Sequence, residues 1–249
     1  MKSKYIAIRS NIRLMKQQRV HKVLARAGVG SRRKCEQLIS QGQVNVNGIP
    51  VQLGAKVGVN DVITVSGKPV VRRETHITYL LNKPVGVVST ARDDKGRPTV
   101  MDFVPQASGL HPVGRLDADS EGLILMSTDG DLTYALTHPK HRTFKGYRVW
   151  TREGILSTES RLKLLDGVII DDGLAIADEV RLLKDGCFVG IHEGRNRQVR
   201  KMLATVGHTV SRLVRVRIGS LSLGRLSVGQ FRIAQVDDIK ATGYTFVRK

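Results

Sequence analysis

Cysteines and aromatic residues are both scarce in this chain of 249 residues. Aromatic side chains make up 4% of it, and the two cysteines are Cys35 and Cys187. They are far apart and form no Cys-x-x-Cys pair, so the sequence predicts neither a disulfide framework nor a cysteine metal site. Cys35 falls on an apolar helical face, where a free cysteine usually behaves as a small buried hydrophobe.

Long hydrophobic runs are missing as well. No window approaches the roughly 18 consecutive apolar residues that a transmembrane helix needs, and the N-terminus lacks the apolar segment of a signal peptide. We therefore expect a cytoplasmic protein without membrane spans. Hydrophobic residues still make up 41% of the chain, which is enough to fill a sizeable core.

Acidic residues number 22 against 41 lysines and arginines, which gives a formal net charge of +19. An imbalance of this size and sign favours a nucleic-acid partner, with an acidic membrane surface as the weaker alternative. Residues 1–17 are rich in basic side chains without an apolar period, and we interpret them as a basic N-terminal tail.

Residues 18–70 predict a small domain of two helices and a hairpin. Apolar residues at helical spacing indicate one helix over 20–27. A second helix follows, with Ser31 as its N-cap and Gly42 as its stop signal. Alternating apolar residues around the turn signal Asn47-Gly48 then predict paired strands.

The first turn of the second helix carries three basic residues, Arg32, Arg33 and Lys34. The helix dipole makes positive charge unfavourable there, by about 0.3 to 1 kcal/mol for each residue. A bound phosphate would compensate, because a helix N-terminus also offers free N–H groups. The alternative is a solvated charge run; we favour phosphate contact because residues 16–34 contain no acidic side chain.

A second, larger domain is predicted over residues 77–249, after a polar linker at 71–76. It begins with a buried strand near residue 77, and two later segments, after Asp131 and around Val199, have the spacing of amphipathic helices. Strands and helices do not alternate as they do in parallel sheets. We therefore predict an α+β fold with a mainly antiparallel sheet flanked by helices.

An acidic loop stands out in this basic chain, with Asp117, Asp119 and Glu121 between two glycines. Its beginning imitates a calcium-binding loop, but Thr128 stands where the bidentate glutamate is required, so metal binding is not favoured. A magnesium-dependent nuclease ranks third among the possible functions, because no distant acidic cluster completes a two-metal site. As a purely structural alternative, Arg115 could hold Asp117 in a local ion pair.

A second basic cluster, residues 194–202, lies on the later predicted helix. Its inward-facing apolar residues point Arg197 and Lys201 away from the core and leave Arg200 at the edge of the buried face. Arg200 can thus reach a partly buried carboxylate, and a close pair of this kind would lower the pKa of the acid by about 1 to 3 units. The strand after this helix predicts one apolar face and one face with Arg215 and Arg217.

The motifs resemble, in order, those of the bacterial rRNA pseudouridine synthases of the RsuA/RluB type. The residues before 71 are similar to a small RNA-binding domain named after a ribosomal small-subunit protein, and the whole resemblance covers about residues 18–235. The segments that carry it in the second domain are Asn82-Lys83-Pro84-x-Gly86-Val87-Val88-Ser89-Thr90, Gly114-Arg115-Leu116-Asp117, Gly122 to Gly130, His138-Pro139, Lys145-Gly146-Tyr147-Arg148-Val149, and Glu193 to Met202.

The resemblance implies that the protein isomerises a specific uridine in ribosomal RNA to pseudouridine. It makes Asp117 the catalytic aspartate, Tyr147 the active-site tyrosine that packs against the base, and Arg200 the basic partner of Asp117. Gly146 stands where the family more often has a bulkier residue. The family needs no metal and no organic cofactor, and whether Asp117 attacks the base, attacks the sugar or removes a proton stays open.

The partner implied is ribosomal RNA or a pre-ribosomal particle, with a slight preference for large-subunit rRNA, and we expect a monomer. The competing function is a noncatalytic RNA-binding or ribosome-assembly protein, which explains the charge but not the ordered motifs. The side chains predicted to contact RNA are Lys22, Arg26, Arg32, Arg33, Lys34, Lys83, Arg115, Arg195, Arg197, Lys201 and Arg215.

Overall fold

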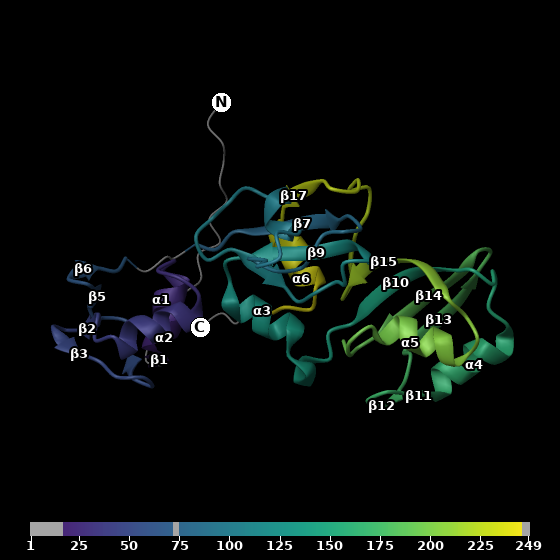
Figure 1. Cartoon of the computed structure of the whole chain (residues 1–249), viewed down its shortest axis with the longest axis horizontal. Coiled ribbons are helices and arrows are strands. Elements are labelled where there is room, and N and C mark those ends of the chain that lie inside the picture. Colours follow the sequence, from purple (N-terminus) through teal and green to yellow (C-terminus); the bar gives the residue numbers. More distant parts are fainter. Residues whose placement is uncertain (1–16, 72–74, 246–249) are drawn as a thin grey trace.

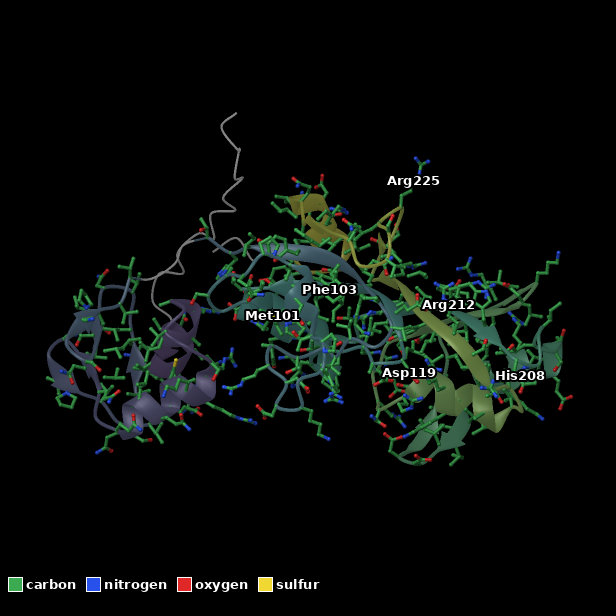
Figure 2. All side chains as sticks on the ribbon, turned by 45° about the horizontal axis from the view of Figure 1, so that its top comes forward. Met101, Phe103, Asp119, His208, Arg212 and Arg225 are labelled. Atoms are coloured by element: carbon green, nitrogen blue, oxygen red, sulfur yellow. The ribbon has the colours of Figure 1, made fainter. Side chains whose placement is uncertain are left out.

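Two parts with separate hydrophobic cores make up the computed structural model (Figure 1), and Figure 2 shows the side chains of both parts. The structure describes residues 17–71 and 75–245. Nearly all of the predicted basic tail and the middle of the predicted linker, residues 72–74, therefore lie outside the described residues. Within the described ranges, no helix combines the length and the apolar character needed to cross a bilayer.

The N-terminal part has the two predicted helices at its centre. Ser31 caps the second one, because its side chain accepts a hydrogen bond from the backbone N–H of Lys34 at 3.2 Å. Asn47 and Gly48 have φ values of 52° and 82°, as the predicted hairpin turn requires. The elements are β1 (Gln18–Arg19), α1 (Val20–Arg26), α2 (Arg32–Ser40), β2 (Val44–Val46), β3 (Ile49–Pro50), β4 (Lys56–Val57), β5 (Ile63–Val65) and β6 (Lys68–Pro69).

The larger part is built on a nine-stranded sheet with the strand order β13-β14-β10-β15-β9-β7-β17, to which β16 and β8 add at β15 and β9. Strands β9 and β15 run parallel, and the other neighbouring pairs described in this sheet are antiparallel. The strands are β7 (Thr78–Lys83), β8 (His111–Val113), β9 (Glu121–Ser127), β10 (Lys145–Thr151), β13 (Glu179–Leu183), β14 (Gly186–Ile191), β15 (Val210–Ile218), β16 (Leu221–Ser222) and β17 (Phe231–Ile233).

Both faces of the strands β7 and β9 are buried. Leu123 and Leu125 of β9 belong to one hydrophobic cluster, whereas Ile124 and Met126 belong to another on the opposite face. A strand covered on both sides needs no polar alternation. This explains the continuous apolar run that follows the acidic loop in the sequence.

Helices cover the two faces of the sheet. The helices α4 and α5 contribute to the cluster with Ile124, and α3 and α6 contribute to the cluster with Leu123. The predicted α+β fold with a mainly antiparallel sheet and flanking helices is thereby confirmed. The remaining elements are η1 (Val100–Phe103), α3 (Gly130–Thr137), η2 (Pro139–His141), α4 (Thr158–Asp166), β11 (Val168–Ile170), β12 (Gly173–Ala175), α5 (Gln198–Thr205) and α6 (Val236–Ala241).

The two parts touch at the beginning of α3, which lies between the purple N-terminal helices and the green half of the sheet in Figure 1. Arg26 of α1 forms an ion pair with Asp131 in the first turn of α3. The Ser108 hydroxyl also donates a hydrogen bond to the Gly28 carbonyl at 2.6 Å. The small domain is thus held against the larger one by polar contacts at this boundary.

Candidate active site

Asp117 lies in the loop between β8 and β9, close to the centre of the large sheet. Its carbonyl accepts a hydrogen bond from the backbone N–H of Ser120 at 3.1 Å, which turns the chain into β9. Gly122 follows, with φ 106°, and a Cβ added there would lie 2.3 Å from the carbonyl oxygen of Arg215 in β15. Only glycine therefore allows β9 to run so close beside β15 and to hold the loop at this point.

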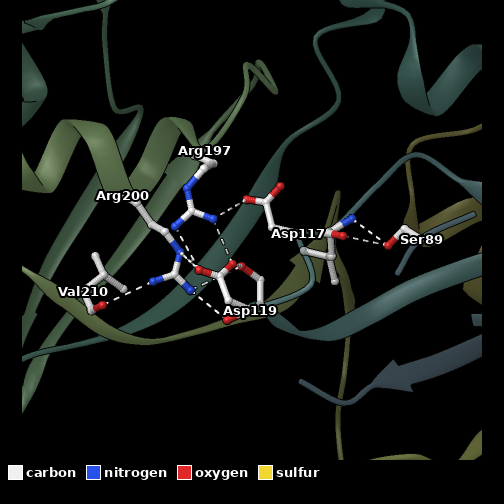
Figure 3. A network of polar contacts seen from close by, with 8 residues as sticks. Ser89, Asp117, Asp119, Arg197, Arg200 and Val210 are labelled. Atoms are coloured by element: carbon white, nitrogen blue, oxygen red, sulfur yellow. Dashed lines mark hydrogen bonds and ion pairs between the residues drawn. The ribbon is translucent and has the colours of Figure 1, made fainter. Parts of the chain in front are cut away.

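The loop is fixed by backbone contacts from a neighbouring segment (Figure 3). The Ser89 hydroxyl donates to the Leu116 carbonyl at 2.8 Å and lies 3.0 Å from the Leu116 N–H, which donates to it. The backbone N–H of Gly86 donates to the Ala118 carbonyl at 2.7 Å. Contacts on both sides of Asp117 thus hold its backbone, although sequence reasoning gave Gly86 and Ser89 no role beyond their place in a motif.

Two arginines from the start of α5 face the loop, and their partners differ from those predicted (Figure 3). Arg200 places Nε 3.4 Å from an Asp119 carboxylate oxygen and donates to the Asp119 carbonyl at 2.8 Å. Arg197 donates two hydrogen bonds of 3.0 and 2.9 Å to the Asp119 carboxylate. Its Nη1 also lies 3.8 Å from Asp117 Oδ2. The predicted ion pair between Asp117 and Arg200 is therefore wrong in this structure.

The positions of the two arginines on α5 explain why Arg197, rather than Arg200, lies beside Asp117. Arg197 is the N-cap residue, in a left-handed conformation with φ 52°, and its exposed side chain extends over the loop. Arg200 is largely buried one turn later, where its Nη1 also donates to the Val210 carbonyl at 3.2 Å. The sequence correctly placed Arg200 at the edge of the core, but helical spacing could not show which carboxylate it would meet.

These contacts set the charge states of the loop. The hydrogen bonds from Arg197 are the main reason why the pKa of Asp119 is held below its usual value, and the same pairing raises the pKa of Arg197. Burial lowers the pKa of Arg200. Arg197 thus binds Asp119 closely, whereas it meets Asp117 at the longer distance of 3.8 Å.

Tyr147 lies on β10, two strands away from the loop and on the same level. It pairs with Arg215 of β15, and Arg215 in turn pairs with Gly122 at the start of β9. With neighbouring strands about 4.8 Å apart, Tyr147 and Gly122 are separated by about 10 Å. Tyr147 is 8% exposed and shares a hydrophobic cluster with Leu116, the residue before Asp117. The tyrosine and the aspartate thus border the same region of the sheet.

Gly146, next to this tyrosine, has a structural reason to be small. A Cβ at this position would lie 2.6 Å from the ring of Phe188 and 3.1 Å from Cβ of Arg217. The bulkier residue found more often in the family cannot fit while Phe188 keeps this position. The departure from the family pattern therefore concerns the opposite face of the sheet and leaves Tyr147 in place.

Two of the predicted RNA contacts, Lys83 and Arg215, are instead buried beneath the loop. Lys83 is fully buried and donates from Nζ to the Pro84 carbonyl at 2.8 Å. Arg215 is 3% exposed and donates to the carbonyls of Leu123 at 2.7 Å and Arg115 at 3.3 Å. Neither side chain is at the surface, so the prediction that they contact RNA phosphates is wrong for this structure.

A bulge explains why Arg215 could not be placed from sequence. The register between β10 and β15 shifts by one residue between Gly146 and Tyr147, so that Gly146 pairs with Arg217 and Tyr147 with Arg215. A shift of this kind turns the following side chains to the other face. Arg215 and Arg217 therefore lie on opposite faces, and the uniform basic face predicted for this strand does not exist.

Comparison with known proteins agrees with this arrangement. Residues 77–205 match the family described as RNA pseudouridylate synthase, and residues 18–63 match the S4 domain. A Bacillus subtilis protein named ribosomal large subunit pseudouridine synthase B is 42% identical over 234 residues, which cover 90% of this chain and 94% of the relative. The chain belongs to the RNA pseudouridylate synthase family.

Two further relatives support the assignment. An uncharacterized RNA pseudouridine synthase of Mycobacterium tuberculosis is 39% identical over 232 residues, which cover 89% of this chain and 91% of the relative. A crystal structure of a pseudouridylate synthase superposes with a TM-score of 0.65 at 28% identity and covers 90% of this chain and 99% of that one. The family and the N-terminal domain inferred from the motifs are thereby confirmed, and the chain is an isomerase of this family.

The remaining predicted RNA contacts fall into two groups. In the S4 domain, Lys22 and the three basic residues that begin α2 are exposed. In the synthase domain most of the predicted side chains have a protein partner: Arg195 binds Glu193 at 2.9 Å and Lys201 binds Asp171 at 2.9 Å, whereas Arg115 is exposed. Arg26, although it belongs to the S4 domain, is held by Asp131.

The three acids of the loop do not act together as a metal site would require. Arg212 holds Glu121 through hydrogen bonds of 2.8 and 2.9 Å, and Arg197 holds Asp119, so the carboxylates point to different partners. No group of three His, Cys, Asp or Glu side chains in the described parts of the chain is placed to bind one ion. The arrangement supports acid, base or nucleophilic chemistry by one carboxylate near an aromatic ring.

Proposed function

We propose that the protein converts a uridine of large-subunit ribosomal RNA to pseudouridine, with Asp117 as the catalytic carboxylate. The observation that carries the proposal is the loop with Asp117, which hydrogen bonds to its backbone hold in place. Asp117 lies beside Arg197 there, on the sheet that also carries Tyr147. The name of the Bacillus relative supports the choice of the large subunit. We propose Tyr147 as the aromatic surface for the base and Arg200 as a residue that orients the loop through Asp119.

The reaction exchanges one bond between base and sugar for another. The bond between N1 of uracil and C1′ of ribose breaks, the base turns, a bond between C5 and C1′ forms, the proton on C5 leaves, and N1 takes up a proton. No electrons are gained or lost. An ionised carboxylate within reach of the nucleoside can serve as nucleophile or as base in this reaction, and we assign one of these two roles to Asp117.

The substrate has to come out of its stack to reach the loop. Enzymes that act on a base extrude the nucleotide from its stack. The free-energy cost of unstacking is offset by stacking of the extruded base on the protein and by phosphate contacts. We assign the stacking surface to Tyr147, whose side chain is 8% exposed, and the phosphate contacts to the exposed basic residues of the S4 domain. We propose that residues 18–70 anchor the RNA, that residues 77–249 carry out the reaction, and that the protein acts as a cytoplasmic monomer on rRNA or a pre-ribosomal particle.

A single substitution tests this assignment. Asp117→Asn keeps the size of the side chain but removes the ionisable group, so pseudouridine formation is expected to fall by a factor on the order of 1000 or more, while binding of an rRNA transcript changes less than about twofold. Release of tritium from C5-labelled uridine in the transcript measures the reaction. Asp94→Asn, at an exposed aspartate paired with Arg92, is the matched control.

Carbodiimide mapping of pseudouridines in rRNA, from cells with and without the gene, identifies the target. One site is expected to lose its signal, and Asp117→Asn is expected not to restore it. An unchanged map would favour the noncatalytic assembly function instead. Appreciable turnover by Asp117→Asn would exclude Asp117 as the catalytic group.

A further inference from the structure

The C-terminal end of α3 and the turn after it carry exposed aromatic and basic side chains. Tyr134 is 46% exposed, and its ring lies 4.8 Å from the His138 ring and 5.4 Å from the His141 ring, measured between centroids. Lys140 places Nζ 4.9 Å from the centre of the same tyrosine ring. We call this surface the α3 patch; its members are Tyr134, His138, Lys140, His141 and Arg142, all of them exposed.

Among the residues that the structure describes, no carboxylate is paired with the α3 patch. Within residues 17–71 and 75–245, none of its basic side chains takes part in an ion pair. In this it differs from Arg195 and Lys201 near the site, which are both paired with carboxylates. An uncompensated cationic surface with an exposed aromatic ring is complementary to a nucleic-acid strand, whose bases stack and whose phosphates are negative.

The helix α3 contacts the S4 domain at its first turn and the segment before Asp117 at its last residue. Its first turn meets the S4 domain, through the ion pair between Arg26 and Asp131. At its last residue, the Thr137 side chain lies 3.4 Å from the position of a Cβ on Gly114, three residues before Asp117. The helix has eight residues and is therefore about 12 Å long. In Figure 1 it lies between the S4 domain and the half of the sheet that carries β10.

The helix α3 therefore connects the boundary with the S4 domain to the segment that leads to Asp117, so an RNA strand bound by both domains can run along it. The α3 patch lies at the end of the helix nearer to Gly114. The apolar residues of α3, Leu132 and Leu136, are buried under the helix, so the patch offers rings and charges rather than an apolar docking face. These properties favour an RNA strand over a protein partner.

We propose that the α3 patch binds the single-stranded RNA next to the target uridine, with a base stacked on Tyr134 and phosphates held by Lys140 and Arg142. This inference rests on the proposed function, because it takes the substrate to be an RNA strand that reaches Asp117. Stacking requires an unpaired base, so the contact is made by a loop or an opened stem next to the extruded nucleotide. The patch thus holds the substrate without taking part in the chemistry.

Three substitutions and one control test the patch on an in vitro transcript of Bacillus subtilis large-subunit rRNA. Tyr134→Ser removes the ring and is expected to raise Kd and KM about tenfold with kcat nearly unchanged, and Tyr134→Phe, which keeps the ring, stays within about twofold of the wild type. Lys140→Gln is expected to reduce the slope of log Kd against log salt by about 1. Lys184→Gln, at an exposed lysine in the turn between β13 and β14, is expected to change neither quantity.

The outcomes separate this inference from the function on which it rests. Filter binding measures the RNA affinity of the patch even if the wild-type protein forms no pseudouridine. A lack of pseudouridine formation would count against the proposed function alone. Equal transcript binding by wild type and Tyr134→Ser, with both proteins folded by circular dichroism, would overturn the patch. A loss of binding to isolated pre-ribosomal particles but not to the transcript would assign the patch to a protein partner and overturn it as well.

Discussion

The basic residues of the S4 domain and those of the synthase domain are used in different ways. Arg33 and Lys34, at the start of α2, are exposed and have no carboxylate in the first turn of their helix. Around Asp117, in contrast, Arg197 and Arg200 are held by Asp119, and Arg215 is buried against backbone carbonyls. The difference teaches that a high positive charge has two roles here, one toward RNA phosphates and the other in building the site.

Among substitutions of basic residues, the largest effect is expected where a buried cation is removed from the synthase domain. Arg215→Met leaves the carbonyls of Leu123 and Arg115 without their donor and loosens the loop that carries Asp117. Because a displacement of about 1 Å in an active site can reduce the rate a hundredfold, kcat is expected to fall about 100-fold. Stopped assays of tritium release, at saturating transcript, measure it.

Arg217→Gln is the matched control, since Arg217 lies two residues later on the other face and stacks on Phe144. It is expected to leave kcat within about threefold of the wild type, because its contacts do not reach the loop. Arg215→Lys keeps the charge but cannot form the same pair of hydrogen bonds, and is expected to regain only part of the rate. If Arg215→Met raised KM for RNA and left kcat intact, the phosphate-binding role predicted from sequence would be restored.

A smaller effect, and on a different quantity, is expected in the S4 domain. Replacing Arg32, Arg33 and Lys34 together by glutamine removes three candidate phosphate contacts, so RNA affinity at 0.15 M salt is expected to fall about 30-fold and the salt slope by about 2 to 3. The value of kcat at saturating RNA should be unchanged. Fluorescence anisotropy over a series of salt concentrations measures both affinity and slope, and an unchanged slope would show that these residues only form a solvated charge run.

The smallest effect is expected in the pH dependence of stability, which the buried Lys83 contributes. Burial lowers the pKa of Lys83 to about 8, against a usual value of about 10.4 in an unfolded chain. Between these values the unfolded state binds more protons, so the stability of the wild type relative to Lys83→Met rises with pH. The gain is expected to be about 1 to 2 kcal/mol from pH 7.5 to 9.5.

Urea unfolding at the two pH values measures this gain, with Lys184→Met as the control at an exposed lysine. The control is expected to differ from the wild type by the same amount at both pH values, because Lys184 is exposed in the folded protein as it is in the unfolded chain. A difference between wild type and Lys83→Met that did not change with pH would mean that burial does not lower the pKa of Lys83 in the folded protein.

Local patterns in the sequence predicted much of the fold correctly. The N-cap at Ser31, the hairpin turn at Asn47-Gly48 and the helix around Val199 each depend on neighbours within a few residues, and the structure confirms all three. The continuous apolar run after the acidic loop forms β9. That it is buried on both faces could not be foreseen, because this depends on helices contributed by distant segments.

Predictions for the site were less complete, and each error has a physical cause. Arg200 was assigned to Asp117, but the left-handed conformation of Arg197 at the N-cap of α5 brings a different guanidinium to that carboxylate. The prediction of one basic face on β15 was wrong because a β-bulge reverses which face of the sheet the following side chains point to. The proposed roles of Asp117 and Tyr147 depend on motifs that the family comparison supports, and they stay predictions until the variants are measured.

The sequence by itself determined the family, the α+β class, the likeness of the N-terminal domain to an RNA-binding module and the acidic loop with Asp117 at its centre, because ordered motifs and local periodicity record these directly. The tertiary structure alone decided which basic residues face solvent and which are buried as Lys83 and Arg215 are. The reason is that the burial and the partner of a long charged side chain depend on strands and helices that lie up to a hundred residues away in the chain.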